Sequence, residues 1–356
     1  MKVGLGIPGP MIDRETLRFA RQIGATCIVA HFASDRGALV EDAAFAEEER
    51  STAGDPRFRY AHFAETKALA AAEGLDLVAV ENFAAADWSD VLGDGPARER
   101  QMCRLKTILR DMGRARIPIL GYNFSLAGVW GRRLSPTARG QALTAVFDRP
   151  EDAPIPRGMI WNQVYDEDLY QRSKGRDFIA PVTEDQLWDR WRRFLTEILP
   201  AARAADVTLA LHPDDPPAPQ LRGTPRLVYR ADYYDRVLAA APDPHNALEF
   251  CVGTLAEMPD QDIYEVVRHF AASGRIAYVH LRNVRGRVPS YQETFTDDGD
   301  VDLQRVLAIL GEAGFKGMVI PDHAPFPTCA APWHAGMAYA VGWIRASLKA
   351  LGQLED

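Results

Sequence analysis

Four side chains with metal-binding chemistry stand at the ends of short apolar segments in the second half of the chain. They are His212 in LALHPDDPP, Cys251 in NALEFCVGT, His280 in YVHLRNVRG and Asp322 in VIPDHAP. In a barrel of parallel strands, the carboxyl-terminal strand ends meet at one face. A single histidine at such a place would more often be structural, but four consecutive segments that end this way predict a shared metal site.

The ligand types indicate which ions would suit this site. Neutral imidazoles, a thiolate and a carboxylate together suit a divalent transition metal. Because a thiolate is a soft ligand, these atoms by themselves favour Zn²⁺ or Fe²⁺, whereas Mn²⁺ prefers harder oxygen donors. We therefore predict a divalent metal held by the four side chains.

Other polar residues near the same segment ends are expected to meet a substrate. Arg282 follows His280 by two positions, so it shares that residue's facing direction and is a candidate clamp for a carboxylate. Asn123, at the end of an earlier segment, is a candidate partner for a hydroxyl. For Arg282 and Asn123 the alternative role is to satisfy loop backbone. His323 directly follows Asp322 and is a candidate general acid or base.

Short apolar segments alternate with longer amphipathic ones along the chain. The longer segments have helical spacing, and two of them end in a glycine that precedes the next strand, Gly24 and Gly314. The expected helices are Asp13–Ile23, Pro56–Glu73, Ala97–Ala115, Glu184–Ala205, Asp262–Ala272 and Val301–Ala313. The expected strands are Val3–Ile7, Thr26–His31, Asp76–Val80, Pro118–Asn123, Val207–His212, Asn246–Cys251, Ile276–Leu281 and Gly317–Pro321. This alternation predicts an α/β fold, a single (β/α)₈ TIM barrel over residues 1–356.

A doubly wound open sheet is the competing architecture. It would usually carry a phosphate-binding glycine loop after the first strand. That place reads GLGIPGPM, where prolines follow the first two glycines and no third glycine is correctly placed. The barrel is therefore favoured.

Residues 131–180 interrupt the alternation after the fourth expected strand. The segment is polar, contains aromatic residues and is too long for a simple loop. We expect an insertion on the catalytic face that acts as a lid or as a contact in a homo-oligomer. A surface excursion without function is the alternative.

The bulk composition narrows the class of protein. The 356 residues carry a formal net charge of −8, which argues against a general binder of nucleic-acid phosphates. The four cysteines are widely scattered and do not suggest a disulfide framework. The start, MKVGLGIPGP, lacks the apolar run of a signal peptide, and no window approaches the roughly 20 apolar residues of a membrane helix. We expect a cytoplasmic protein with a small-molecule substrate and neither nucleic acid nor membrane as partner.

The segments that carry the expected ligands also resemble a known family. HPDDPP at 212–217, EFCVGT at 249–254, VHLRNV at 279–284 and PDH at 321–323 resemble the mannonate dehydratase family, whose fold is a xylose isomerase-like barrel. The YNF, Trp-Gly-Arg and ETFTDDGDVDLQRVLAILGEAGFKG segments, which begin at positions 122, 130 and 293, resemble it as well. The resemblance covers most of the chain from about residue 100 onward, and more loosely its start.

The resemblance implies an activity and roles for individual residues. The implied reaction is dehydration of D-mannonate to 2-keto-3-deoxy-D-gluconate, with Mn²⁺ as the usual cofactor. The implied metal ligands are His212, Cys251, His280 and Asp322, and the implied catalytic residue is His323.

The chain departs from the family pattern among the residues expected to face the substrate. The family's catalytic tyrosine, in a GYG-like stretch after PDH, is replaced here by Trp333-His334-Ala335-Gly336, and we expect His334 to take that role. Aromatic residues expected near the mouth, Trp130 among them, suggest contact with a bulkier substrate. The alternatives are therefore a metal-dependent sugar isomerase or epimerase with another substrate, and a sugar-acid-binding protein without catalysis. The intact ligand set argues against the second.

Overall fold

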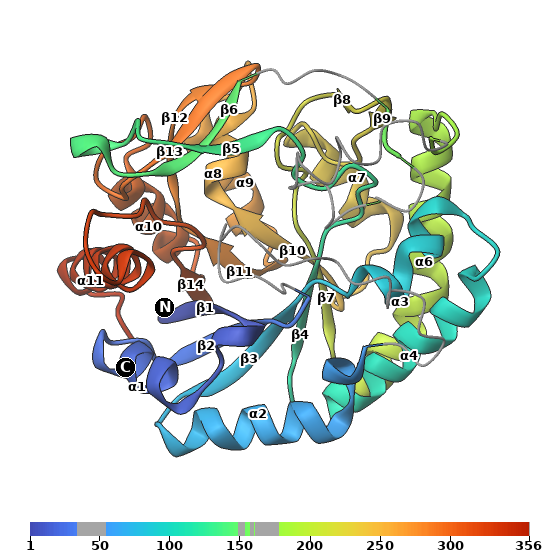
Figure 1. Ribbon diagram of the computed structural model, residues 1–356, viewed down its shortest axis with the longest axis horizontal. Helices are drawn as coiled ribbons and strands as arrows, with labels where there is room; N and C mark the ends of the chain where they lie inside the picture. The colour runs from blue at the N-terminus through green and yellow to red at the C-terminus, as the bar shows by residue number, and fades with distance from the viewer. Residues whose placement is uncertain (34–54, 149–153, 157–159, 161–177, 356) are drawn as a thin grey trace.

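The computed structural model describes residues 1–33, 55–148, 154–156, 160 and 178–355, and its centre is a closed barrel of eight parallel strands (Figure 1). The eight apolar segments form the barrel in the order β1-β14-β11-β10-β7-β4-β3-β2, which confirms the predicted fold. Their bounds are β1 Lys2–Pro8, β2 Cys27–His31, β3 Asp76–Glu81, β4 Ile119–Tyr122, β7 Thr208–Leu211, β10 Asn246–Cys251, β11 Ile276–His280 and β14 Met318–Ile320.

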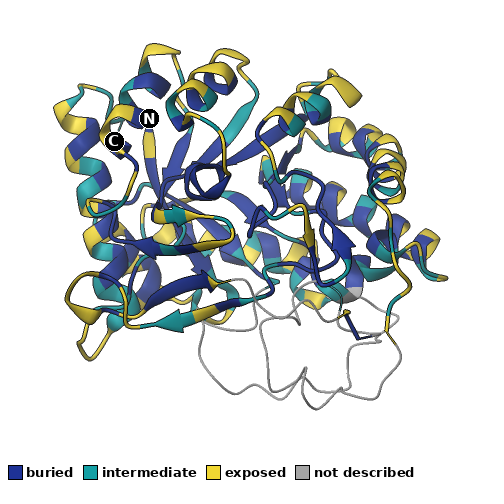
Figure 2. Cartoon of the chain, turned by 90° about the horizontal axis from the view of Figure 1, so that it is seen from above, coloured by how far each residue is buried: buried dark blue, intermediate teal, exposed yellow. Residues whose placement is uncertain are grey.

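The strands are apolar along their length because both of their faces are covered. All six residues of β10 are buried, and so are Val3 to Ile7 of β1. A small buried cluster that includes Val29, Tyr278 and Ile320 fills the inside of the barrel, and a much larger one lies between the barrel and its helices. Figure 2 shows this layering, with buried strands at the centre and exposed residues on the outer faces of the helices. Helices on the outside of a parallel sheet produce this pattern.

The predicted helices also form, with ends that match their sequence signals. Asp13 caps α1 by accepting a hydrogen bond from the Thr16 amide at 2.8 Å. Gly24 and Gly314 have φ values of +102° and +81°, the backbone conformation in which glycine commonly ends a helix. These helices are α1 Arg14–Gln22, α2 Tyr60–Ala72, α4 Arg98–Arg114, α6 Glu184–Ala205, α9 Ile263–Ala272 and α10 Leu303–Glu312, with 3-10 turns η1 Gly9–Met11 and η3 Pro56–Phe58. The last helix of the described chain, α11 Pro332–Ala350, lies beyond the predicted segments.

Three shorter helices are absent from the sequence prediction: α3 Ala85–Gly93, α7 Asp232–Ala240 and α8 Val252–Glu257. The reason is clearest for α8, whose six residues are all buried. A helix buried on every side has no polar face, so it lacks the apolar periodicity by which helices are recognised.

A second sheet, also absent from the sequence prediction, stands at the upper left of Figure 1. Its strands are β12 Asn283–Arg287, β13 Ser290–Thr294, β6 Thr144–Asp148 and β5 Arg132–Ser135, in that order, with the 3-10 turn η4 Arg139–Gln141 between β5 and β6. The sheet joins the first part of the 131–180 insertion to the hairpin that follows β11. Residues 149–153, 157–159 and 161–177 of the insertion lie outside the described residues, so its role as a lid or oligomer contact stays a prediction.

A two-stranded sheet, β8 Gln220–Leu221 with β9 Thr224–Pro225, completes the strands of the described chain. Across the helices of that described part, none is both long enough and apolar enough to cross a membrane.

A glycine on β4 tests how tightly the inside of the barrel is filled. A methyl group at Gly121 would overlap the carboxylate of Glu249 and the hydroxyl of Tyr278. We expect Gly121→Ala to lower the free energy of unfolding by about 1–3 kcal/mol, measured by urea denaturation, because a close-packed interior does not absorb an added methyl group.

The control is Gly342→Ala on the exposed face of α11, where an added methyl group meets nothing within 4 Å. It should raise the free energy of unfolding by about 0.5–1 kcal/mol through helix propensity. A Gly121→Ala protein as stable as the wild type would contradict the packing described here.

Candidate metal centre and active site

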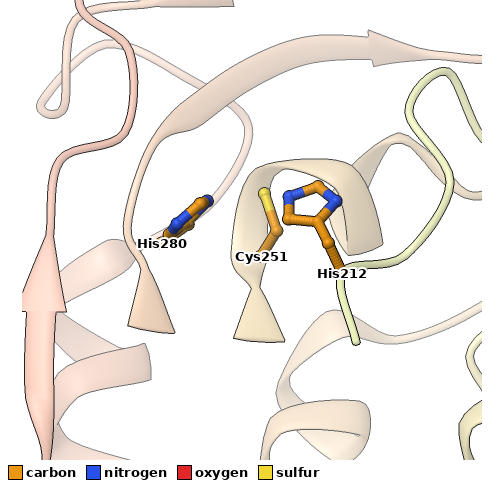
Figure 3. Close-up of side chains that lie close together, drawn as sticks. All are labelled: His212, Cys251 and His280. Atoms are coloured by element: carbon orange, nitrogen blue, oxygen red, sulfur yellow. The ribbon is translucent and has the colours of Figure 1, made fainter. Parts of the chain in front are cut away.

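The barrel brings three of the four predicted ligands together at the carboxyl-terminal ends of its strands. His212 directly follows β7, Cys251 ends β10 and His280 ends β11, and Cys251 and His280 are register partners in the sheet. The candidate ligand atoms of the three residues all lie within 4.8 Å of one another. Figure 3 shows the thiol of Cys251 between the two imidazole rings, an arrangement in which all three side chains could bind one ion.

Asp322, the fourth predicted ligand, reaches the same place by an unusual backbone conformation. It lies two residues beyond β14 with φ at +60°, a left-handed value that costs most residues energy but that aspartate tolerates better. Its Oδ2 atom is 3.5 Å from Nδ1 of His280 and 4.0 Å from the sulfur of Cys251. Strained backbone of this kind collects at functional sites.

The electrostatics of the group favour a cation. Burial by itself would raise the pKa of the Cys251 thiol, but Arg282 and His212 outweigh burial and hold that pKa well below its usual value. The thiolate accepts hydrogen bonds from the Thr254 amide at 3.4 Å and from its hydroxyl at 3.1 Å. Burial opposes protonation of His212, yet the neighbouring thiolate raises its pKa to about 10. A metal bound at this site would displace the proton that His212 holds and would take its place beside the thiolate.

The donor set therefore fits a divalent metal. Both ring nitrogens of buried His280 face carboxylates, Nδ1 that of Asp322 at 3.5 Å and Nε2 those of Glu249 and Glu81 at 3.2 and 3.3 Å. Two imidazoles, a thiolate and a carboxylate from four adjacent strands match the ligand types that transition metals accept.

Beneath this group, inside the barrel, lie two buried carboxylates that the sequence prediction did not assign. Glu249 Oε1 is 3.2 Å and Glu81 Oε2 is 3.3 Å from Nε2 of His280. Burial and the charge of Glu81 raise the pKa of Glu249 well above its usual value. Burial opposes ionisation of Glu81 as well, but His31 and His280 lower its pKa to about 2. The pair holds the His280 ring with Nδ1 toward Asp322. The available signal was the position of Glu249 two residues before Cys251, on the same face of an apolar strand.

His323, the predicted acid or base, stands beside the proposed ligands. Its side chain is 41% exposed, and its Nε2 is 3.5 Å from Asp322 Oδ1. Its Nδ1 faces Glu293 Oε1 at 2.9 Å and Arg132 Nη2 at 3.1 Å. Burial opposes protonation, but Asp322 and Glu293 outweigh it and raise the pKa of His323. The ring is thus accessible and able to hold a proton.

Arg282, predicted to clamp the substrate carboxylate, instead donates hydrogen bonds to side chains of the protein itself. Its guanidinium bonds to Glu257 and Asp215 at 2.6 Å, to Asp322 at 3.1 Å and to the Thr254 hydroxyl at 3.0 Å, with the residue 1% exposed. This geometry favours a role in fixing Asp322 over direct contact with substrate. Asp215, in the turn that follows His212, is one of the carboxylates that fix Arg282.

The remaining predicted site residues do not gather with the ligands in the same way. Asn123, just beyond β4, donates to the Pro213 carbonyl at 3.3 Å, the backbone role that was its alternative. Trp130 is 2% exposed and lies under the guanidinium of Arg222 at 3.5 Å. His334 lies in the first turn of α11, and its ring packs against Phe19 and Trp333.

Comparison with known proteins shows the family to which the chain is similar. The family described as D-mannonate dehydratase (UxuA) matches residues 9–331. A mannonate dehydratase of Streptococcus pneumoniae is 28% identical over 271 residues, which cover 73% of this chain and 72% of that protein.

Solved structures extend the match to the whole barrel. The crystal structure of a mannonate dehydratase from Streptococcus suis superimposes with a TM-score of 0.76 at 25% identity, covering 100% of this chain and 96% of that one. A xylose isomerase domain protein from Planctomyces limnophilus has a TM-score of 0.57 at 13% identity, covering 99% and 98%, and shares the fold. Because the family match spans nearly the whole barrel, including every strand end that carries a proposed ligand, the chain belongs to the D-mannonate dehydratase family.

Proposed function

We propose that this protein is a metal-dependent hydro-lyase that converts D-mannonate, or a closely related sugar acid, to its 2-keto-3-deoxy product. The observation that carries the proposal is the convergence of His212, Cys251 and His280, with ligand atoms within 4.8 Å, in a chain of this family. We assign these three residues and Asp322 as the metal ligands. Mn²⁺ is the ion that the resemblance implies, and the thiolate also suits Fe²⁺ or Zn²⁺.

The reaction needs proton transfers and no oxidant. The C2 proton leaves to a base, and the C3 hydroxyl departs as water after it gains a proton. The enol that remains then loses its hydroxyl proton and gains a proton at C3, which gives the 2-keto group. A bound divalent metal would stabilise the negative charge that develops next to the carboxylate.

His323 is the residue we assign to one of these proton movements. Its exposed ring lies beside Asp322 and holds or accepts a proton through Nε2, while Nδ1 is occupied by protein partners. The family tyrosine absent from this chain had suggested His334 as a second proton-transfer group. The packing of His334 against Phe19 supports that role less well than the setting of His323 supports its own.

Turnover of D-mannonate tests the function directly. With Mn²⁺ added, the purified protein should release the 2-keto-3-deoxy acid, detected chemically as a 2-keto acid. A chelator should abolish the activity, and Mn²⁺ should restore it. A protein that retains metal yet leaves D-mannonate unchanged would sink the proposal and direct the search to other sugar acids and to ketose isomerisation.

Substitution of the thiolate tests the ligand set. Cys251→Ala should lose bound metal, measured by elemental analysis, and lose turnover, because a soft ligand is removed from a four-ligand site. The fold should persist, since the residue ends a strand. Cys27→Ala is the matched control, because Cys27 is an equally buried thiol on β2, away from the site. Full metal occupancy in Cys251→Ala would show that the assignment is wrong.

Substitution of His323 separates metal binding from proton transfer. His323→Asn should keep its metal but lose kcat by roughly 10²–10⁴-fold, the usual contribution of a general acid or base. His269→Asn, on the exposed face of α9, is the control for histidine loss. His334→Asn assayed alongside decides between the two predicted histidines. An active His323→Asn enzyme would exclude His323 from the chemistry.

A further inference from the structure

A carboxylate from the second sheet lies against the back of the proposed proton-transfer histidine. Glu293 lies on β13, in the hairpin after β11, and is 3% exposed. Its Oε1 atom is 2.9 Å from Nδ1 of His323. The other ring nitrogen, Nε2, is on the side of Asp322, where the proposed metal and substrate would be.

We propose that Glu293 is a positioning residue, which accepts a hydrogen bond from Nδ1–H of His323 and so leaves Nε2 as the nitrogen that exchanges a proton with the substrate. The inference rests on the proposed function only in its assignment of His323 to proton transfer. A neutral imidazole carries its proton on one nitrogen, and the partner of one nitrogen decides which form is present.

The carboxylate of Glu293 is held in place and kept ionised by its other neighbours. Arg132, on β5, contacts the same Oε1 atom, and Nη1 of Arg282 lies 3.5 Å away. Burial opposes ionisation of Glu293, but His323, Arg132 and Arg282 outweigh it and lower its pKa. The backbone is fixed as well, because Glu293 pairs with Val284 across the hairpin. An ionised, immobile acceptor is what an imidazole N–H requires.

Arg132 is the competing partner for the same ring nitrogen. Its Nη2 lies 3.1 Å from Nδ1 of His323. If Arg132 donated to Nδ1, the proton would sit on Nε2 and the ring would present the opposite form to the substrate. Glu293 is closer, at 2.9 Å. Arg132 also has the carboxylates of Asp215 and Glu293 to receive its protons, so it does not need the imidazole.

Glu293→Gln is the first test. We expect kcat to fall at least about 10-fold and no further than the roughly 10²–10⁴-fold contribution of the histidine itself. KM should change less than about 3-fold, and bound metal should stay, because Glu293 contacts His323 and two arginines but none of the four proposed metal ligands.

Glu257→Gln is the matched control. Glu257 is an equally buried carboxylate on the same Arg282, but within the described part of the chain it forms no hydrogen bond or ion pair with His323. It should show a comparable loss of thermal stability with a fall in kcat at least ten times smaller than that of Glu293→Gln. Equal losses of kcat in the two variants would mean that Glu293 acts only through the ion pairs of Arg282, and would overturn the inference.

A second measurement does not depend on turnover. In Zn²⁺-loaded protein labelled with ¹⁵N-histidine, with His323 assigned by comparison with His323→Asn, the neutral ring should carry its proton on Nδ1. A proton on Nε2 would make Arg132 the partner and overturn the inference. If the wild type does not turn over D-mannonate, the proposed function fails while this spectrum still decides the role of Glu293. If the wild type is active and Glu293→Gln matches it within twofold, the inference fails alone.

Discussion

The catalytic end of this barrel is organised around one buried guanidinium. Arg282 is 1% exposed and bonds to Asp322, Glu257 and Asp215, with Glu293 at 3.5 Å. A buried carboxylate is costly unless it is paired, and a planar guanidinium can serve several carboxylates at once in fixed directions. The same charge lowers the pKa of the Cys251 thiol. The guanidinium of Arg282 thus fixes the position of Asp322 and favours the ionised form of Cys251.

This arrangement also explains why the second sheet matters for the site. Asp215 and Glu293 are shared between Arg282 and Arg132, and Tyr291 of β13 donates to Asp215 at 2.7 Å. The insertion strand β5 and the hairpin strand β13 are therefore tied to the barrel through buried charge as well as through backbone pairing. Networks of this kind rigidify a site when every member is satisfied.

The sequence allowed the barrel, and the grouping of its candidate metal ligands, to be predicted for a geometric reason. Parallel strands end at one face, so His212, Cys251 and His280 could be placed together from their positions at strand ends alone. The second sheet could not be predicted, because its pairing of β13 with β6 depends on segments about 140 residues apart that carry no local signal of each other. For the same reason, Arg282 was expected to meet substrate. Its carboxylate partners come from the loop after β7, from helix α8, from β13 and from the loop after β14, and only the folded chain brings them to it.

The arrangement of the ligands around the barrel suggests how a substrate would be held. All four proposed ligands lie at the ends of β7, β10, β11 and β14, which are adjacent strands, so a metal held by them would lie toward one side of the mouth. A catalytic metal keeps at least one position open for substrate, and ligands drawn from one arc leave the opposite side for it. His323 follows the last of these strands and therefore stands at the edge of that arc. A sugar acid bound through its carboxylate end would then present C2 and C3 toward His323, the residue proposed for one of the proton movements of the dehydration.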